Sequence, residues 1–333
     1  MKSTENILLI RLKSIGDILL TLPAVHAVRK NFPQAKLHFL VSKEHSPLLR
    51  GFSEIDEIIP LDRAVFRAKN WLAICSSTFN LARQLRGQKF SLVVDFQGYG
   101  ETAWLSWFSN ASERWGSVYR PARAWAYTRG ECRNDHIHAA EWNLCLLQQC
   151  GLSIGKVRNE YVLPNDALDE ASRFFAANGL NPAKPTIFIQ PFTSSPQKNW
   201  PLENYLKLTR HWRSHGLQVL FGGSPSENAA LEPARKAGFP VSAGVSLLVT
   251  GGLMKLSTLT IGGDTGALHL AVAMGKRVIM IMESLDPGRA HPFQHPEWTV
   301  VPRQGKFVTG ISIETVLTAC ERALSELKAV RIG

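Results

Sequence analysis

Short apolar runs alternate along the chain with longer stretches in which apolar residues recur every three or four positions. The runs at 7–10 and 37–41 are typical of buried strands, whereas the spacing at 17–31 indicates an amphipathic helix. Strands that alternate with helices along one chain predict parallel sheets with helical crossover connections. We therefore expect an α/β protein.

The same alternation continues to the end of the chain. The predicted strands are 7–10, 37–41, 57–60, 90–95, 186–190, 217–221, 258–261, 277–282 and 298–301. The predicted helices cover 17–31, 71–87, 136–150, 166–178, 201–215, 226–237 and 312–327, and a further helix follows the glycine turn at 262–263. Both halves therefore have the layout of a doubly wound α/β fold.

The pattern breaks near 163–166 and restarts with the strand at 186. A chain of 333 residues also exceeds one typical domain. We therefore expect two Rossmann-like domains, 1–165 and 166–333. The prediction allows the final helix to pack back on the first domain.

Asp17 stands in the first turn of the helix that follows the first strand. In an open parallel sheet this turn lies at the carboxyl ends of the strands, where ligands bind. Asp17 is therefore a candidate functional carboxylate. The alternative is that it only stabilises the helix N-terminus, an effect of about 0.3–1 kcal/mol.

Three strand ends in the second half carry groups suited to a nucleotide-sugar. Hydroxyls at 193–195 and then Lys198 follow the strand at 186–190. The next glycine turn leads to Glu227, which suits a ribose or simply stabilises a helix start. The turn at 262–266 adds glycines, a carboxylate and a hydroxyl at a helix N-terminus, where phosphate binds well.

The charge of the chain favours an anionic partner. Lys and Arg number 38 against 27 Asp and Glu, a formal net charge of +11. Nucleic acid, a membrane surface or a phosphorylated substrate would each fit this excess. No recognised nucleic-acid motif accompanies the charge, so nucleic acid is the weakest of the three.

Basic residues gather at 63–89 and at 114–133, and the second region interleaves arginines with tryptophans and tyrosines. Such a mixture suits a lipid headgroup zone or a phosphorylated sugar. The alternative is a solvated loop with partly buried aromatic rings. We expect a peripheral contact with an anionic membrane surface here.

Cysteine usage and hydropathy indicate the compartment. The five cysteines have neither metal-ligand spacing nor a paired framework, which suits a reducing cytoplasm. No apolar stretch approaches the roughly 18 residues of a membrane-spanning helix. We expect a cytoplasmic protein that contacts a membrane only peripherally.

Four segments together resemble glycosyltransferase family 9, the ADP-heptose:lipopolysaccharide heptosyltransferases. They are 10–24, 90–98, 198–201 and 263–271. The resemblance spans almost the whole chain in the same order. It implies a GT-B fold, in which two Rossmann-like domains face a central cleft.

The resemblance also implies an activity. The N-terminal domain would hold the acceptor, the Kdo–lipid A region or a core heptose of lipopolysaccharide. The C-terminal domain would hold ADP-heptose. Transfer would invert the anomeric centre, with no cofactor and no metal, at the inner face of the inner membrane.

The matching motifs imply some of the residue roles, and the positions of charged and polar groups suggest the others. The resemblance implies that Asp17 is the general base and that Lys198 contacts the donor phosphate. The residues expected at the donor are Thr193, Ser194, Glu227, Val245, Asp264, Thr265, Gly266 and His269. The residues expected at the acceptor are Lys13, Ser14, Gly16, Arg63, Arg67 and Arg120. For His269, a buried structural role is the alternative.

Two other functions stay open. One is a non-catalytic binding or assembly protein on a GT-B scaffold. The other is a glycosyltransferase that uses a different nucleotide-sugar. The presence of Asp17 together with Lys198 and Asp264 favours the enzyme.

Overall fold

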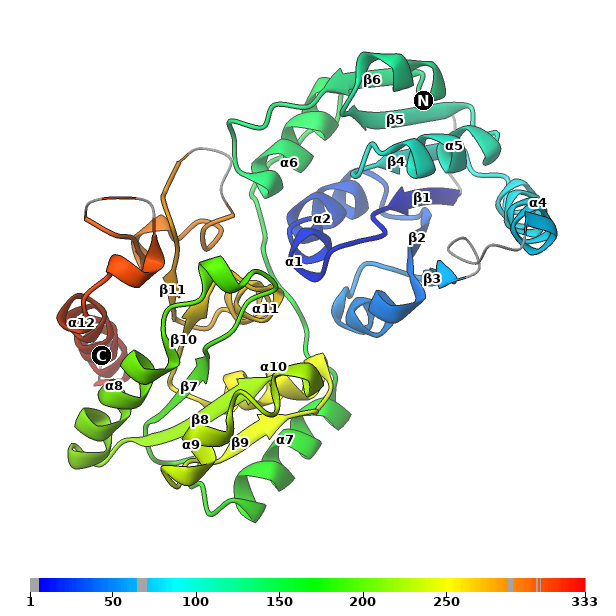
Figure 1. Cartoon of the computed structure of the whole chain (residues 1–333). Helices are drawn as coiled ribbons and strands as arrows, with labels where there is room; N and C mark the ends of the chain where they lie inside the picture. The colour runs from blue at the N-terminus through cyan, green and yellow to red at the C-terminus, as the bar shows by residue number, and fades with distance from the viewer. Residues whose placement is uncertain (1–5, 65–70, 287–289, 304, 306, 333) are drawn as a thin grey trace. The chain divides into compact units, whose positions relative to one another are not determined.

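The chain forms two compact units, Met1–Asn159 and Glu160–Gly333. The computed structural model describes residues 6–64, 71–286, 290–303, 305 and 307–332 (Figure 1). The backbone N–H of Tyr161 donates to the carbonyl of Ala273 at 2.8 Å, which ties the segment after 160 to the second unit. The division therefore comes earlier than the position after 165 that the sequence pattern indicated.

The first unit is built on a six-stranded parallel sheet of order β3-β2-β1-β4-β5-β6. Its strands are β1 Asn6–Ile10, β2 Lys36–Ser42, β3 Glu57–Leu61, β4 Leu92–Asp95, β5 Glu113–Val118 and β6 Arg129–Cys132. This is the strand order of a Rossmann fold.

Helices connect these strands. They are α1 Ile15–Leu19, α2 Leu22–Asn31, α4 Trp71–Gly87, α5 Gly100–Phe108 and α6 Ala139–Gln149, with the 3₁₀ helices η1 Lys43–Gly51 and η2 Pro121–Ala126. Leu8 and Val93 of the sheet pack with Leu85 of α4 and Leu105 of α5 in one core, while α2 lies beside α6 (Figure 1). Both α4 and α5 therefore cover the same face of the sheet.

The helix predicted at 17–31 is two helices, α1 and α2. The hydroxyl of Thr21 donates to the carbonyl of Ile18 at 2.7 Å, and the backbone N–H of Thr21 bonds to the same carbonyl. Pro23 then stands in the first turn of α2, where its missing N–H costs nothing. The break follows from this turn, which apolar spacing alone does not reveal.

The sequence pattern missed β5, β6 and α5. The region 114–133 is not a simple solvated loop, because it supplies β5, η2 and β6. A Cβ at Gly116 would lie 2.2 Å from the ring of Tyr127, so this glycine marks close packing rather than a turn. The pattern of apolar residues did not predict β5, because an arginine and a central glycine interrupt it.

The second unit repeats the arrangement with the order β12-β11-β10-β7-β8-β9, again all parallel. Its strands are β7 Thr186–Gln190, β8 Gln218–Gly223, β9 Val241–Ala243, β10 Leu259–Gly263, β11 Val278–Ile281 and β12 Thr299–Val300. Counted from β7, the strand order equals that of the first sheet. The three-residue β9 and the helix α10 Leu247–Leu256 were not predicted.

The remaining helices of this unit flank the sheet. They are α7 Asn165–Ala177, η3 Pro196–Lys198, α8 Leu202–Ser214, η4 Pro225–Glu227, α9 Glu232–Lys236, α11 Gly266–Ala273, η5 Pro296–Trp298, η6 Val308–Gly310 and α12 Ile313–Ile332. From α12, Val316, Cys320 and Ala323 join the core of the second unit. These three side chains of the final helix thus pack in the core of its own unit.

Each sheet has one point at which the strand order reverses. In the first sheet this point lies between β1 and β4, and in the second it lies between β7 and β10. Ligands of open α/β sheets bind outside the carboxyl ends of the strands at such a point. The α/β class with two Rossmann-like sheets is confirmed, and its topology indicates where each site should lie.

Candidate active site

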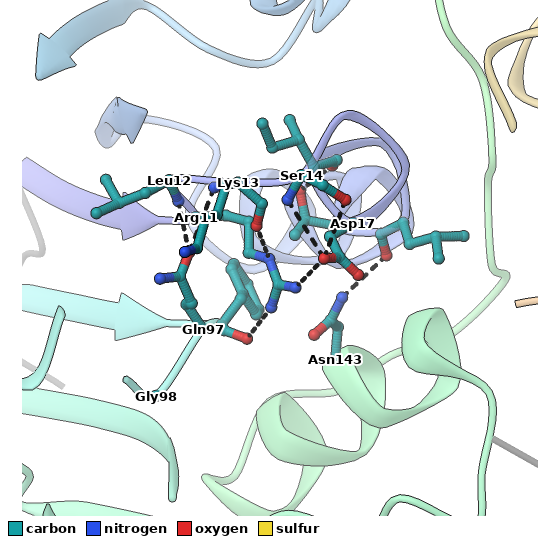
Figure 2. A network of polar contacts seen from close by, with 12 residues as sticks. Arg11, Leu12, Lys13, Ser14, Asp17, Gln97, Gly98 and Asn143 are labelled. Carbon is teal, nitrogen blue, oxygen red and sulfur yellow. Dashed lines mark hydrogen bonds and ion pairs between the residues drawn. The ribbon is translucent and has the colours of Figure 1, made fainter. Parts of the chain in front are cut away.

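The carboxylate of Asp17 lies beside the reversal point of the first sheet, in the first turn of α1 (Figure 2). Its Oδ2 accepts from Nη2 of Arg11 at 2.7 Å, from the backbone N–H of Ser14 at 3.3 Å and from the Ser14 hydroxyl at 3.2 Å. The side chain is still 39% exposed. Asp17 is therefore fixed in place and accessible to a ligand.

Arg11 is the group that holds this carboxylate. Its Nε donates to the carbonyl of Lys13 at 3.0 Å, and its Nη1 donates to the carbonyl of Phe96 at 2.8 Å. Figure 2 shows the guanidinium lying between the loop after β4 and Asp17. Because Arg11 is buried, this geometry is fixed by the fold. The sequence pattern alone gives Arg11 no functional role.

The surroundings of Asp17 set its charge. Burial raises the pKa of the Asp17 carboxyl, but the nearby Arg11 guanidinium and the hydrogen bonds from Arg11 and Ser14 lower it, and the net pKa lies below the ordinary value. Asp17 is thus ionised at neutral pH. Ser14 and Asp17 also form a capping box on α1, so the helix-stabilising interpretation is realised as well. The two interpretations are compatible.

A second polar layer supports the loop that carries Asp17. The side-chain carbonyl of Gln97 accepts from the backbone N–H groups of Leu12 at 3.0 Å and Lys13 at 3.3 Å. Asp95, which is fully buried, accepts from the N–H of Gln97 at 2.9 Å and from the Tyr127 hydroxyl at 2.7 Å. Burial raises the pKa of Asp95. A chain of contacts thus runs from Tyr127 to the loop of Asp17.

Gly98 completes this layer. Its N–H donates to Asp95 at 3.0 Å, and its φ of +69° lies in the left-handed region. A Cβ at this position would lie 1.5 Å from the carbonyl oxygen of Ser117. Only glycine fits where the loop after β4 passes β5.

The residues expected at the acceptor have mixed surroundings. Lys13 Nζ lies 5.8 Å from the centre of the Tyr99 ring, and Ser14 is exposed beside Asp17. Gly16 lies in the same turn of α1 as Asp17. These three residues surround the carboxylate, and their acceptor role stays a prediction.

The predicted arginines of the acceptor site differ from one another. Arg63 makes a bidentate pair with Glu101, with bonds of 3.1 and 3.0 Å, so its guanidinium is already engaged. Arg120 is exposed just before η2. Arg67 lies outside the described residues. Of the two described arginines, Arg120 is thus better placed for an anionic acceptor than Arg63.

In the second unit, Asp264 lies at the reversal point between β7 and β10. Its two carboxylate oxygens contact Nζ of Lys198 at 3.1 Å and Nε2 of His269 at 3.2 Å. Burial raises the pKa of Asp264, yet His269 and Lys198 outweigh burial and lower it to about 2. The sequence prediction thus named three residues that the fold brings together.

These groups border a pocket. Its lining is Lys198, Asp264, Ile281, Met282, Glu283 and Ser284. His269 is buried, its Nε2 faces Asp264, and its Nδ1 has no hydrogen-bond partner among the described residues. This position fits the structural alternative for His269, because the buried ring contacts Asp264 and is not among the lining residues.

The hydroxyl loop after β7 is held by its own contacts. The Thr193 hydroxyl donates to the carbonyl of Ser195 at 2.8 Å and accepts from the N–H of Ser195 at 3.2 Å. The Thr193 N–H donates to the side chain of Asn199 at 2.8 Å, a contact that the sequence analysis did not anticipate. Ser194 is exposed. Thr193 therefore shapes the loop, while Ser194 presents its hydroxyl to solvent.

The remaining predicted donor residues lie at helix starts. Thr265 caps α11 by accepting from the N–H of Leu268 at 3.3 Å, and Gly266 is the first residue of that helix. Glu227 accepts from the N–H of Ser224 at 2.7 Å, which realises its helix-start alternative. Val245 is half-buried just before α10. Their contacts with a donor stay predictions.

Comparison with known proteins decides the family. Residues 78–306, more than half of the chain, match the family model of glycosyltransferase family 9 (heptosyltransferase). The chain belongs to glycosyltransferase family 9. The resemblance seen in the four sequence segments is confirmed, and the protein is a glycosyltransferase.

Relatives in this family have low sequence identity to this chain, but they align with most of its length. Lipopolysaccharide core heptosyltransferase OpsX of Haemophilus influenzae is 21% identical over 304 residues, which cover 88% of this chain and 83% of the relative. Lipopolysaccharide heptosyltransferase 3 of Escherichia coli is 23% identical, with 93% of this chain and 96% of the relative covered.

Solved structures of the family share the fold. A family 9 glycosyltransferase from Veillonella parvula superposes with a TM-score of 0.87 at 20% identity, covering 98% of this chain and 99% of the other. The E. coli heptosyltransferase WaaC with ADP-2-deoxy-2-fluoro heptose gives 0.76 at 20% identity, covering 95% and 99%. The GT-B class is confirmed.

Two further observations concern metal binding and membrane-spanning helices. Among the described residues, no group of three or more His, Cys, Asp or Glu side chains is placed to hold a metal ion. Within the same part of the chain, no helix is both long and apolar enough to cross a bilayer.

Proposed function

We propose that this family 9 glycosyltransferase moves heptose from ADP-heptose to the inner core of lipopolysaccharide, with inversion at the anomeric carbon. Two observations carry the proposal: an ionised, accessible Asp17 beside the reversal point of the first sheet, and Lys198, Asp264 and His269 together at the reversal point of the second. The names of the distant relatives support the choice of heptose and lipopolysaccharide.

Asp17 acts as the general base. An acceptor hydroxyl gives its proton to the carboxylate and its oxygen lone pair to the anomeric carbon, while the bond from that carbon to the ADP oxygen breaks. A base must lie within hydrogen-bond reach of the proton that it takes. Arg11 and Ser14 bind Oδ2 of Asp17, which leaves Oδ1 for the acceptor.

The second unit stabilises the departing diphosphate. Lys198 leaves its contact with Asp264 for a donor phosphate, and the N-terminus of α11 at Thr265 and Gly266 favours the same negative charge. Asp264 then binds hydroxyls of the sugar, and His269 keeps it in place. Ser194 adds a hydroxyl, Glu227 a carboxylate for ribose and Val245 an apolar wall for adenine. In this proposal the reaction uses neither a metal nor a cofactor.

The acceptor places the enzyme at a membrane. A lipid-linked, anionic acceptor calls for peripheral contact with the inner face of the inner membrane and leaves nucleic acid without a role. Several arginines of the region 114–133 are engaged within the fold. Arg114, Arg123 and Arg129 donate to backbone carbonyls, and Arg133 pairs with Asp135. Membrane contact therefore needs more than these side chains.

The proposal is tested in two steps. Calorimetry with ADP, UDP and GDP is expected to give clear preference for ADP, because the donor is ADP-heptose. Transfer is then measured with ADP-heptose and a Kdo–lipid A acceptor. Preference for UDP or GDP would point to another nucleotide-sugar, and ADP binding without any transfer would point to a non-catalytic binding protein.

A further inference from the structure

One face of α5 carries large aromatic side chains in contact with solvent. Trp104 and Trp107 are 50% and 43% exposed, and Phe108 is half-buried beside them. Positions i, i+3 and i+4 share one helix face. The residues of α5 that face away from this side, Thr102 and Ser106, and the flanking Ala103 and Leu105 are buried. Trp104 and Trp107 of α5 thus keep a large part of their surface in contact with solvent.

A fourth ring extends this face. Trp125 of η2 is 47% exposed, and its ring centre lies 4.6 Å from that of Trp104 and 6.1 Å from that of Trp107. Phe108 lies 5.6 Å from Trp104 and 5.4 Å from Trp107. We call these four residues, Trp104, Trp107, Phe108 and Trp125, the aromatic surface.

A contiguous group of this kind differs from an isolated exposed ring. Single apolar residues on a surface need no explanation, whereas a contiguous apolar patch marks an interaction site. The rings already contact one another, yet the three tryptophans keep nearly half of their surface in water. The partner must therefore offer an apolar layer.

The charges around the aromatic surface are positive. In sequence, α4, α5 and η2 hold a single acidic residue, Glu101, and both of its oxygens accept from Arg63. Arg86 of α4 donates to the carbonyl of Phe108 at 3.1 Å, which places a guanidinium at the edge of the rings. Arg123 precedes Trp125 by two residues. The partner should therefore be anionic as well as apolar.

A lipid bilayer with anionic headgroups meets both requirements. Indole rings combine an apolar body with an N–H group and favour the interface between lipid and water. Arginines beside them gain about 1 kcal/mol each from an anionic surface. A second copy of the chain fits less well, because Arg86 and Arg123 of both copies would repel one another.

We propose that the aromatic surface inserts into the headgroup zone of an anionic lipid bilayer. The inference rests on the proposed function for the reason why a membrane is the partner, since the acceptor is lipid-linked. It replaces the basic region 114–133 as the principal contact, because only Trp125 of that region belongs to the surface.

The helix that carries most of the aromatic surface begins beside the loop of the candidate base. Tyr99 caps α5, and Lys13 of the Asp17 loop lies over its ring. Trp104 follows Tyr99 by five residues, about 8 Å along the helix axis. A bilayer that receives the tryptophans therefore brings its headgroup sugars near the loop of Asp17.

The test is co-sedimentation with vesicles of phosphatidylglycerol and phosphatidylcholine, compared with vesicles of phosphatidylcholine alone, at low and high salt. The full chain should bind the anionic vesicles and bind them less in high salt. The triple variant Trp104→Ser, Trp107→Ser, Trp125→Ser should bind at least about tenfold more weakly, because it loses three interfacial rings.

Matched controls test whether the loss of vesicle binding is specific to the aromatic surface. Phe307→Ser removes an exposed aromatic ring from the second unit and should leave vesicle binding unchanged. Thermal unfolding and ADP affinity of the triple variant should match those of the unaltered chain, which shows that it folds. Loss of vesicle binding would support the inference even if no heptose transfer were detected, because vesicle binding is measured without any sugar.

Two results would overturn the inference. One is vesicle binding by the triple variant equal to that of the unaltered chain. The other is a self-association of the unaltered chain that the three substitutions abolish, with no binding to either kind of vesicle. The second result would assign the aromatic surface to another copy of the chain.

Discussion

Arg11 and Asp17 form a 2.7 Å ion pair in which the arginine is buried and the carboxylate is partly exposed. The same guanidinium binds the carbonyls of Lys13 and Phe96, so it joins the loop after β1 to the loop after β4. The charge of the proposed base and the shape of its loop therefore depend on one side chain. Substitutions at the two positions can therefore distinguish the loss of the proposed base from a change in its pKa.

Asp17→Asn removes the proposed base and keeps the size of the side chain. Turnover with ADP-heptose and a Kdo-containing acceptor should fall by roughly 10²–10⁴, the usual contribution of general base catalysis. ADP affinity should persist, because the residues proposed to bind the donor belong to the second unit. Near-normal turnover of the variant would leave Asp17 with only its capping role on α1.

Arg11→Gln should raise the pKa of Asp17. Burial raises that pKa and the Arg11 charge and hydrogen bond lower it, so their loss should raise the pKa, although the Ser14 hydrogen bonds remain. A base loses activity once it is protonated, and the acidic limb of kcat/KM should therefore move to higher pH. Arg29→Gln is the matched control, since Arg29 also binds a carboxylate and backbone carbonyls in the first unit. An unmoved acidic limb would exclude this role for Arg11.

Lys198→Ala should weaken donor binding and turnover without unfolding the protein. A charge-assisted hydrogen bond to phosphate contributes roughly 1.5–3 kcal/mol, which corresponds to roughly tenfold to a hundredfold in affinity for ADP. Calorimetry measures this change. Lys207→Ala, an exposed lysine of α8, serves as the control for loss of positive charge. Equal ADP affinity and turnover in the two variants would contradict the prediction.

Asp264 should make stability depend on acid. Its folded pKa of about 2 lies below the ordinary 3.8, so its ion pairs stabilise the fold above pH 4, and this term is lost as pH falls through 2. The contribution is about 2 kcal/mol at neutral pH and roughly half of that at pH 3.

Urea unfolding of the unaltered chain and of Asp264→Asn at both pH values measures this dependence. The stability gap between the two proteins should narrow from pH 7 to pH 3, because the variant lacks the titrating carboxylate. If the difference in free energy of unfolding were the same at both pH values, ionisation of Asp264 would not contribute to stability.

Apolar runs were enough to locate nine of the strands, because a buried parallel strand is apolar on both faces. The same principle explains why β5 was missed, since its sequence is Glu-Arg-Trp-Gly-Ser-Val and its packing depends on the distant ring of Tyr127. The helix α5 was missed because its aromatic outer face hides the amphipathic pattern that identifies a helix.

The sequence pattern also predicted which strand ends carry candidate functional side chains. Asp17, Lys198 and Asp264 stand on the segments that follow β1, β7 and β10, and the carboxyl ends of parallel strands lie at one edge of their own sheet. Arg11 and Gln97 could not be predicted, since they act through contacts with residues some 85 positions away. Arg63 looked like a ligand for an anion until its pairing with Glu101 became visible, and that pairing spans 38 positions.

Gly98 has a consequence for any screen of random variants. No side chain fits between its backbone and the carbonyl of Ser117. Every amino-acid substitution at this position should therefore disturb the loop that orders Leu12 and Lys13. In a selection for activity, position 98 will tolerate as little as a residue that touches substrate. Intolerance to substitution in this enzyme therefore reports on backbone crowding as well as on chemistry, and only a measurement of folding tells the two apart.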